Sequence, residues 1–204
     1  MNAGENESPA EPPGGGVRAF VALGMSGEIA DAAASFIGEM RKVAGADAMR
    51  WTARARLHLT LRFLGDDADR DRIARLKAGL AEIASACTSF RIEGRGAGAF
   101  PNLARPRIFW IGLAGAPLSD LAARVETSAI RAGFAPDPRG FTAHLTIGRI
   151  RGGRRAASLL RAAIASAAAR EFAAAIADSL ILYRSRGGPN GAQYVELARF
   201  PFAP

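Results

Sequence analysis

The chain has 204 residues, 49% of them hydrophobic, so it is long enough to bury one sizeable core or two small lobes. Its formal net charge of +8 and pI of about 11.0 favour an anionic partner, with RNA, DNA or a nucleotide first. One cysteine, Cys87, excludes an intrachain disulfide, and with only two histidines no metal site of the common zinc types is expected.

The first sixteen residues differ in composition from the rest. They contain Pro9, Pro12, Pro13, three consecutive glycines, three glutamates and no basic residue, which predicts a disordered acidic tail over residues 1–16. This segment lacks the basic start and apolar run of a secretory signal, and no charge-free apolar stretch of the chain reaches membrane-spanning length. We therefore expect a cytoplasmic monomer with one domain at 17–204, which carries a charge of +11.

Hydrophobic periodicity and turn residues predict the elements of the first half. In order, they are a strand at 17–23, a helix capped by Ser26 and ended by Gly45, a strand at 56–65, a helix capped by Asp66, Asp67 or Asp69, and a strand at 90–93. The glycine-rich segment 94–98 is predicted to be a loop. It is not a dinucleotide fingerprint, because no helix pattern begins behind it.

The second half repeats this order, with one more strand at its end. It is predicted to contain a strand at 107–113, a helix at 117–132, a strand at 141–149, an alanine-rich helix at 155–172, and strands at 178–185 and 194–200 around a turn at 187–191. Trp51 and Trp110 are expected in the core. The repetition predicts a duplicated, bilobal α+β fold, with two antiparallel sheets facing a central cleft and helices on the outside.

Both histidines lie in strands with the same local pattern. Strict alternation places His58, Thr60 and Arg62 on one face of the first strand, opposite a face of leucine and phenylalanine. In the second strand His144 and Thr146 share a face. Threonine accounts for only six of the 204 residues, so two His-x-Thr elements are roughly a one-in-a-thousand coincidence.

Arg149 follows the second motif. In a straight strand it falls on the face opposite His144, and it reaches the cleft only if Gly148 permits a bulge or bend. The residue belongs to a basic block, because residues 138–170 contain no acid but seven arginines at positions 139, 149, 151, 154, 155, 161 and 170. This block is the main sequence signal for an anionic ligand.

Two imidazoles across a cleft can act as an acid–base pair, since the ordinary histidine pKa lies near 6.5. In-line displacement at phosphorus needs one group to take a proton from the attacking oxygen and another to protonate the departing oxygen. Thr60 and Thr146 can donate hydrogen bonds to the non-bridging oxygens, and Arg62 or Arg149 can add charge-assisted ones. Nothing in this scheme requires a metal or another cofactor.

At these residues the chain resembles the 2H phosphoesterase superfamily, most closely its RNA 2′,3′-cyclic phosphodiesterase branch, once called 2′-5′ RNA ligases. The paired His-x-Thr elements carry the resemblance, in the extended forms HLTLRFLG at 58–65 and HLTIGR at 144–149. Further similar segments are RAFVA at 18–22, FP at 100–101, RIFW at 107–110, LYRS at 182–185 and the closing strand at 194–201. The resemblance covers about 17–202.

The resemblance implies metal-independent hydrolysis of an RNA terminal 2′,3′-cyclic phosphate to a 2′-phosphate. It implies that His58 and His144 are the acid and base, that Thr60 and Thr146 hold the phosphate, and that Arg149 contacts it. We assign His144 as the base and His58 as the acid. The two motifs are nearly symmetric, so the sequence leaves the reverse assignment open.

Other readings remain at this point. The same in-line step could join RNA ends through a 2′-5′ linkage as a side activity. A phosphodiesterase for a small cyclic nucleotide is a related alternative. A basic RNA-binding module without catalysis is an alternative of a different class, although binding alone would not need both histidines.

Overall fold

The computed structural model describes residues 16–151, 153–188 and 192–203. The predicted tail, except Gly16, and the tip of the turn at 187–191 lie outside this range. The elements are β1 (Val17–Gly24), α1 (Gly27–Ala44), η1 (Ala46–Ala48), β2 (Met49–Trp51), η2 (Arg54–Arg56), β3 (His58–Ala68), α2 (Arg70–Ser85), β4 (Phe90–Phe100), β5 (Ile108–Ala114), α3 (Leu118–Arg131), β6 (His144–Ile150), α4 (Arg154–Ser166), β7 (Glu171–Ala177), β8 (Ser179–Arg186) and β9 (Gln193–Pro201).

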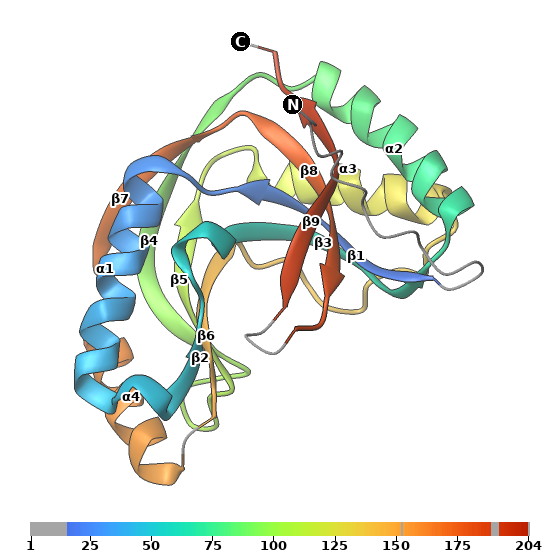
Figure 1. Ribbon diagram of the computed structural model, residues 1–204. Coiled ribbons are helices and arrows are strands. Elements are labelled where there is room, and N and C mark those ends of the chain that lie inside the picture. The colour runs from blue at the N-terminus through green and yellow to red at the C-terminus, as the bar shows by residue number, and fades with distance from the viewer. Residues whose placement is uncertain (1–15, 152, 189–191, 204) are drawn as a thin grey trace, which may run out of the picture.

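The described strands form one continuous antiparallel sheet, so the prediction of two separate sheets is wrong. Its order is β7-β4-β5-β6-β3-β1-β8-β9, with β2 beside β6, and it curls around a concave face (Figure 1). The sheet is continuous because the two histidine strands, β3 and β6, pair with each other through Leu59 and Leu145. We call β3, β1, β8 and β9 the His58 lobe, and β6, β5, β4, β7 and β2 the His144 lobe.

Helices cover the convex face of the sheet, as the prediction of an α+β fold requires (Figure 1). Two of the helices pack against the lobe opposite to the strand that precedes them. Helix α1 follows β1 of the His58 lobe, yet it packs on β7 and α4 of the His144 lobe. Helix α3 links β5 to β6, yet it packs on β3 and α2. The duplicated halves therefore build a single body rather than two separable lobes.

The helices begin and end at positions that local chemistry explains. The side chain of Asp69 accepts a hydrogen bond from the backbone N–H of Arg72 at 2.8 Å, which confirms it as the cap of α2. Gly45 ends α1 with φ of 93°, a conformation that favours glycine. Within the described residues, no helix is long and apolar enough to cross a membrane.

The predicted helix at 155–172 is too long. Helix α4 ends at Ser166, and the residues from Glu171 onward form β7, which pairs along β4 at the edge of the sheet. The high helix propensity of alanine is overridden there by strand pairing and by the contact of Phe172 with Phe36, whose ring centroids lie 5.2 Å apart. The short strand β2 was also missed, because three residues give no usable period.

The glycine-rich segment 94–98 is part of β4 and not a loop. The pairing of β4 with β5 shifts between Gly94 and Ala97, and Gly96 has a positive φ of 71°. This is the geometry of a β-bulge, which glycine accommodates without steric cost. The bulge lets β4 continue to Phe100 beside the concave face.

We predict that the contact between the histidine strands is a major source of stability. Leu59 and Leu145 are both 0% exposed, so Leu145→Ala should lower the free energy of unfolding by about 2–5 kcal/mol in urea titrations. Leu159→Ala on α4 is the matched control, since that side chain is 43% exposed and should change stability by less than about 0.5 kcal/mol. Equal losses in both variants would contradict the prediction.

Candidate active site

The four motif residues surround the point where β3 meets β6. Pairing of Leu59 with Leu145 sets the antiparallel register, so His58 lies nearest Thr146, and Thr60 lies nearest His144. The two histidines therefore occupy one diagonal, which in a regular ladder spans about 7–8 Å. The two imidazoles also interact electrostatically, because the charge of His144 contributes to lowering the pKa of His58. The sequence motifs, 86 residues apart, thus converge on one patch.

Each imidazole is anchored in the same way. Nδ1 of His58 lies 2.8 Å from the carbonyl oxygen of Arg56, and Nδ1 of His144 lies 2.7 Å from that of Thr142. A carbonyl oxygen only accepts, so Nδ1 must be the N–H donor in both rings. Nε2 is then left as the atom that can take up or release a proton at the cleft.

Aromatic side chains form walls around both histidines. The ring centroid of His58 lies 4.9 Å from that of Phe20 and 5.0 Å from that of Tyr194, and the centroid of His144 lies 4.9 Å from that of Phe100. Burial lowers the pKa of both histidines below 6.5, despite the backbone hydrogen bonds that oppose the shift. The neutral imidazole is therefore favoured at neutral pH.

Trp110 belongs to the cleft and not to the core, contrary to the sequence-based expectation. Its ring centroid lies 6.4 Å from that of His144 and 5.3 Å from that of Phe100. The indole lies flat over Gly98, where an added Cβ would come within 2.3 Å of the indole carbon Cζ2. Sequence reasoning missed this role, because only the strand register reveals that Trp110 and Thr146 share a face.

Equivalent bulges interrupt the two histidine strands just after their threonines. On β3 the pairing with β1 jumps from Thr60 to Arg62, and on β6 the pairing with β5 jumps from Thr146 to Gly148. Each bulge inserts one extra residue, so the side chains beyond it change faces. The strict alternation expected for the strand at 56–65 therefore ends at Leu61.

On β3 the bulge turns Arg62 away from the cleft, so the prediction that it shares a face with His58 is wrong. The side chain is 6% exposed on the helix-covered side, where it pairs with Glu126 of α3 and lies 3.5 Å from Asp137. It also donates to the carbonyl oxygen of Ala135. We infer that Arg62 stabilises the packing of α3 and the 135–137 segment and does not bind substrate.

On β6 the equivalent bulge turns Arg149 toward the cleft. It returns the side chain to the face of Thr146, as its register position opposite Ile108 shows. The positive charge helps to lower the pKa of His144, which places the guanidinium within electrostatic reach of the imidazole. Arg149 is exposed, and it forms no ion pair with an acid in the described part of the chain.

Neither threonine hydroxyl of the motif is used within the fold. Thr60 and Thr146 are half-buried, and among the described residues their side chains have no hydrogen-bond partner. Both hydroxyls are thus available to a ligand at the centre of the patch. The described residues also contain no group of three or more His, Cys, Asp or Glu side chains placed to hold a metal ion.

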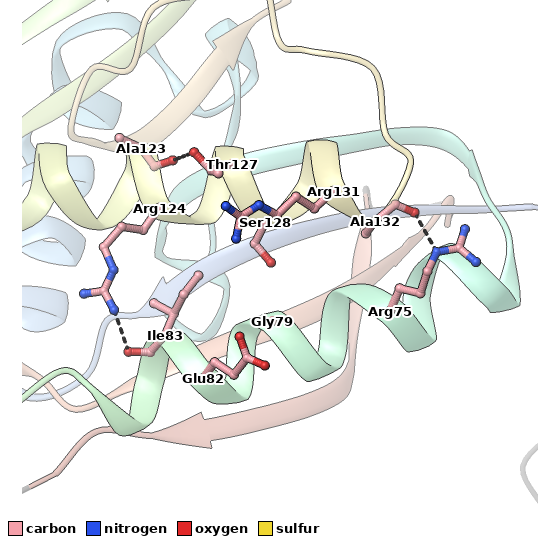
Figure 2. Close-up of a pocket in the computed structure, with 10 residues that line it drawn as sticks. All are labelled: Arg75, Gly79, Glu82, Ile83, Ala123, Arg124, Thr127, Ser128, Arg131 and Ala132. Carbon is pink, nitrogen blue, oxygen red and sulfur yellow. Dashed lines mark hydrogen bonds between the residues drawn. The ribbon is translucent and has the colours of Figure 1, made fainter.

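Two hollows lie away from the histidines. The first, of about 370 Å³, is the groove between α2 and α3, lined by Arg75 and Arg131 among others (Figure 2). The second, of about 400 Å³, lies beside β2 and is lined by Arg41, Arg50 and Arg151 among others. Neither is lined by a residue of the two motifs. The second hollow lies next to Arg149, because its lining residue Arg50 is paired with Arg149 in the sheet.

The fold of this chain matches that of solved phosphoesterase structures of the LigT type. The structure of TT0787 of Thermus thermophilus aligns over 91% of this chain and 97% of that chain, with a TM-score of 0.72 and 22% identity. E. coli LigT complexed with 3′-AMP aligns over 91% of this chain and 98% of that chain, with a TM-score of 0.71 and 22% identity. These likenesses establish the fold.

Sequence comparisons establish the family. The LigT like Phosphoesterase model matches residues 23–110. The RNA 2′,3′-cyclic phosphodiesterase of Aquifex aeolicus is 37% identical over 139 residues, which are 66% of this chain and 71% of the relative. That of Archaeoglobus fulgidus is 35% identical over 136 residues, which are 66% and 73%. The chain belongs to the LigT-like 2H phosphoesterases, in the family of the RNA 2′,3′-cyclic phosphodiesterases.

We predict that Arg62→Met destabilises the protein without weakening substrate binding. The substitution leaves the partly buried carboxylate of Glu126 without its cation and Asp137 with Arg139 alone, which should cost about 1–3 kcal/mol in urea unfolding. KM of the folded enzyme should stay within about threefold. Arg149→Met is the control and should show the reverse pattern. A tenfold rise in KM at unchanged stability for Arg62→Met would restore its substrate-binding role.

We predict a bell-shaped pH dependence of kcat/KM with its maximum below pH 6.5. Acid–base work by the pair needs one histidine protonated and the other neutral, and both pKa values are lowered by burial. Activity should fall as pH rises, because the proton donor is lost, and at low pH, because the base is protonated. A profile that rises steadily above pH 7 would contradict this.

Proposed function

We propose that this protein hydrolyses the terminal 2′,3′-cyclic phosphate of RNA to a 2′-phosphate by acid–base catalysis with two histidines. The observation that carries the proposal is the patch around Leu59 and Leu145, where two equivalently anchored imidazoles alternate with two free hydroxyls. The names of the relatives, RNA 2′,3′-cyclic phosphodiesterases, supply the substrate class.

The proposed site binds the phosphate through neutral and charged donors. The hydroxyls of Thr60 and Thr146 would donate to the two non-bridging oxygens, one from each strand. Arg149 would add a charge-assisted hydrogen bond from the side of His144. Donors that are held in place by a sheet need little reorganisation as negative charge develops on phosphorus, and this is the basis of transition-state stabilisation here.

The two imidazoles would serve the two reacting oxygens. Nε2 of His144 takes a proton from water while the water oxygen bonds to phosphorus. The bond from phosphorus to the 3′ oxygen breaks, and Nε2 of His58 donates its proton to that oxygen. The products are a 3′-hydroxyl and a 2′-phosphate. The diagonal arrangement supports an acid–base pair, since a phosphate bound between the two threonines would have one imidazole on each side.

A related reaction needs only a different nucleophile. If the 5′-hydroxyl of a second RNA takes the place of water, the same step forms a 2′-5′ linkage with loss of the 3′ oxygen. We propose this ligation as a minor activity of the same site. It would compete with hydrolysis and would be favoured only by high concentrations of RNA ends.

We predict that His58→Ala and His144→Ala each lower kcat/KM by about 10²–10⁴ on an RNA that ends in a 2′,3′-cyclic phosphate. Thr60→Ala and Thr146→Ala should lower it by about 10–10³, since each removes one donor to the phosphate. Thr127→Ala, on α3 with its hydroxyl bonded to Ala123, is the control and should leave the rate unchanged. Excess EDTA should not affect the wild-type rate. Unimpaired histidine variants would refute the proposal.

The assignment of acid and base can be tested in the same assay. An analogue with sulfur in place of the 3′ oxygen has a leaving group that needs no proton, because thiolates form far more readily than alkoxides. This analogue should restore activity to His58→Ala but not to His144→Ala. Rescue of His144→Ala alone would show that His144 is the acid and His58 the base.

A further inference from the structure

The bulge on β6 aligns Arg149 with an arginine of the neighbouring strand. Arg50 of β2 lies directly opposite Arg149 in the antiparallel register, so the two side chains share the face that carries Thr146 and Trp110. Both are exposed. Like charges at opposite positions of a sheet repel each other, so the pair is unfavourable unless an anion lies between or beside them.

Arg50 also lines the 400 Å³ hollow beside β2, together with Arg41 and Arg151. We call these three arginines the β2 edge. Asp47 is the one acid among the residues that line this hollow. Within the described residues, none of the three arginines forms an ion pair with a carboxylate. The hollow is therefore positively charged and adjoins the candidate active site through Arg50.

The arginines at the two ends of the basic block at 138–170 are paired with acids. Arg139 is bonded to Asp137, and Arg170 makes two hydrogen bonds to Glu39 at 2.6 and 2.9 Å. Arg149 and Arg151, in contrast, lie near the cleft without such partners among the described residues. The fold thus neutralises the two ends of the block and leaves the arginines between them, beside the β2 edge and on α4, without an acid partner among the described residues.

We propose that the β2 edge binds the RNA backbone on the 5′ side of the cyclic phosphate, an inference that rests on the proposed function. A 2′,3′-cyclic phosphate closes the 3′ end, so every further phosphate of the substrate lies on its 5′ side. The guanidinium group binds phosphate oxygens in a bidentate manner. The edge therefore selects a polymeric RNA end over a nucleoside 2′,3′-cyclic phosphate, which has no second phosphate.

The test compares two substrates with the same terminal base. One is a nucleoside 2′,3′-cyclic phosphate, and the other is a tetranucleotide that ends in the same group. The variant is Arg50→Gln/Arg151→Gln, and the charge-matched control is Arg75→Gln/Arg131→Gln in the groove between α2 and α3 (Figure 2). Circular dichroism spectra are compared with that of the wild type to check that both variants are folded.

We expect the wild type to prefer the tetranucleotide at low salt. In the β2-edge variant, kcat/KM on the tetranucleotide should fall about tenfold, and kcat/KM on the nucleoside should stay within twofold. The slope of log kcat/KM against log salt should fall by about 1.4, since single strands release about 0.7 ion per phosphate contact. An equal loss on both substrates, or an equal loss in the control, would overturn the proposal.

A binding measurement separates this proposal from the proposed function. Fluorescence anisotropy with a labelled tetranucleotide that ends in a 3′-phosphate needs no turnover. If the wild type hydrolyses neither substrate, the proposed function fails. The β2 edge is still supported when the variant binds this RNA about tenfold more weakly than the control does, and it is refuted when the two bind equally.

Discussion

The direct pairing of the two histidine strands is the constraint on which the rest of the structure depends. Leu59 and Leu145, both fully buried, fix the register of β3 against β6. That register alone decides that each histidine faces the threonine of the other strand. A shift of either strand by one residue would turn its own histidine and threonine into the core. The helices that cross between the lobes stabilise the same arrangement from the convex side.

Burial of the histidines gives the site its chemical character. The aromatic side chains of Phe20, Tyr194 and Phe100 cover part of the two imidazoles, and this burial lowers the pKa of both histidines. The backbone carbonyls that hold Nδ1 act in the opposite direction and fix the orientation of each ring. Burial and the backbone hydrogen bonds thus shift the pKa of each histidine in opposite directions, and burial has the larger effect, while Nε2 is left to exchange protons at the cleft. Both histidines are the first residues of their strands, so the pairing of β3 with β6 that stabilises the fold also positions the two imidazoles.

The sequence was sufficient to predict what depends on local pattern. Hydrophobic periodicity predicted the strand character of both motifs, and turn and cap residues predicted the cap at Asp69. Together they predicted the α+β class. The faces of Arg62 and Arg149 were not, because a bulge of one residue exchanges them and leaves no clear mark in a single sequence. Strand β7 was hidden by alanine-rich composition, since its pairing partner lies about 80 residues earlier along the chain.

In the mechanism that we propose, water attacks phosphorus between the two histidines and the 3′ oxygen leaves. The most direct measurement is phosphorus NMR of the product formed from RNA 2′,3′-cyclic phosphate in ¹⁸O-labelled water. We expect a 2′-phosphate that carries one ¹⁸O on phosphorus. A 3′-phosphate would show that the 2′ oxygen leaves instead, and a product without the label would contradict direct attack by water.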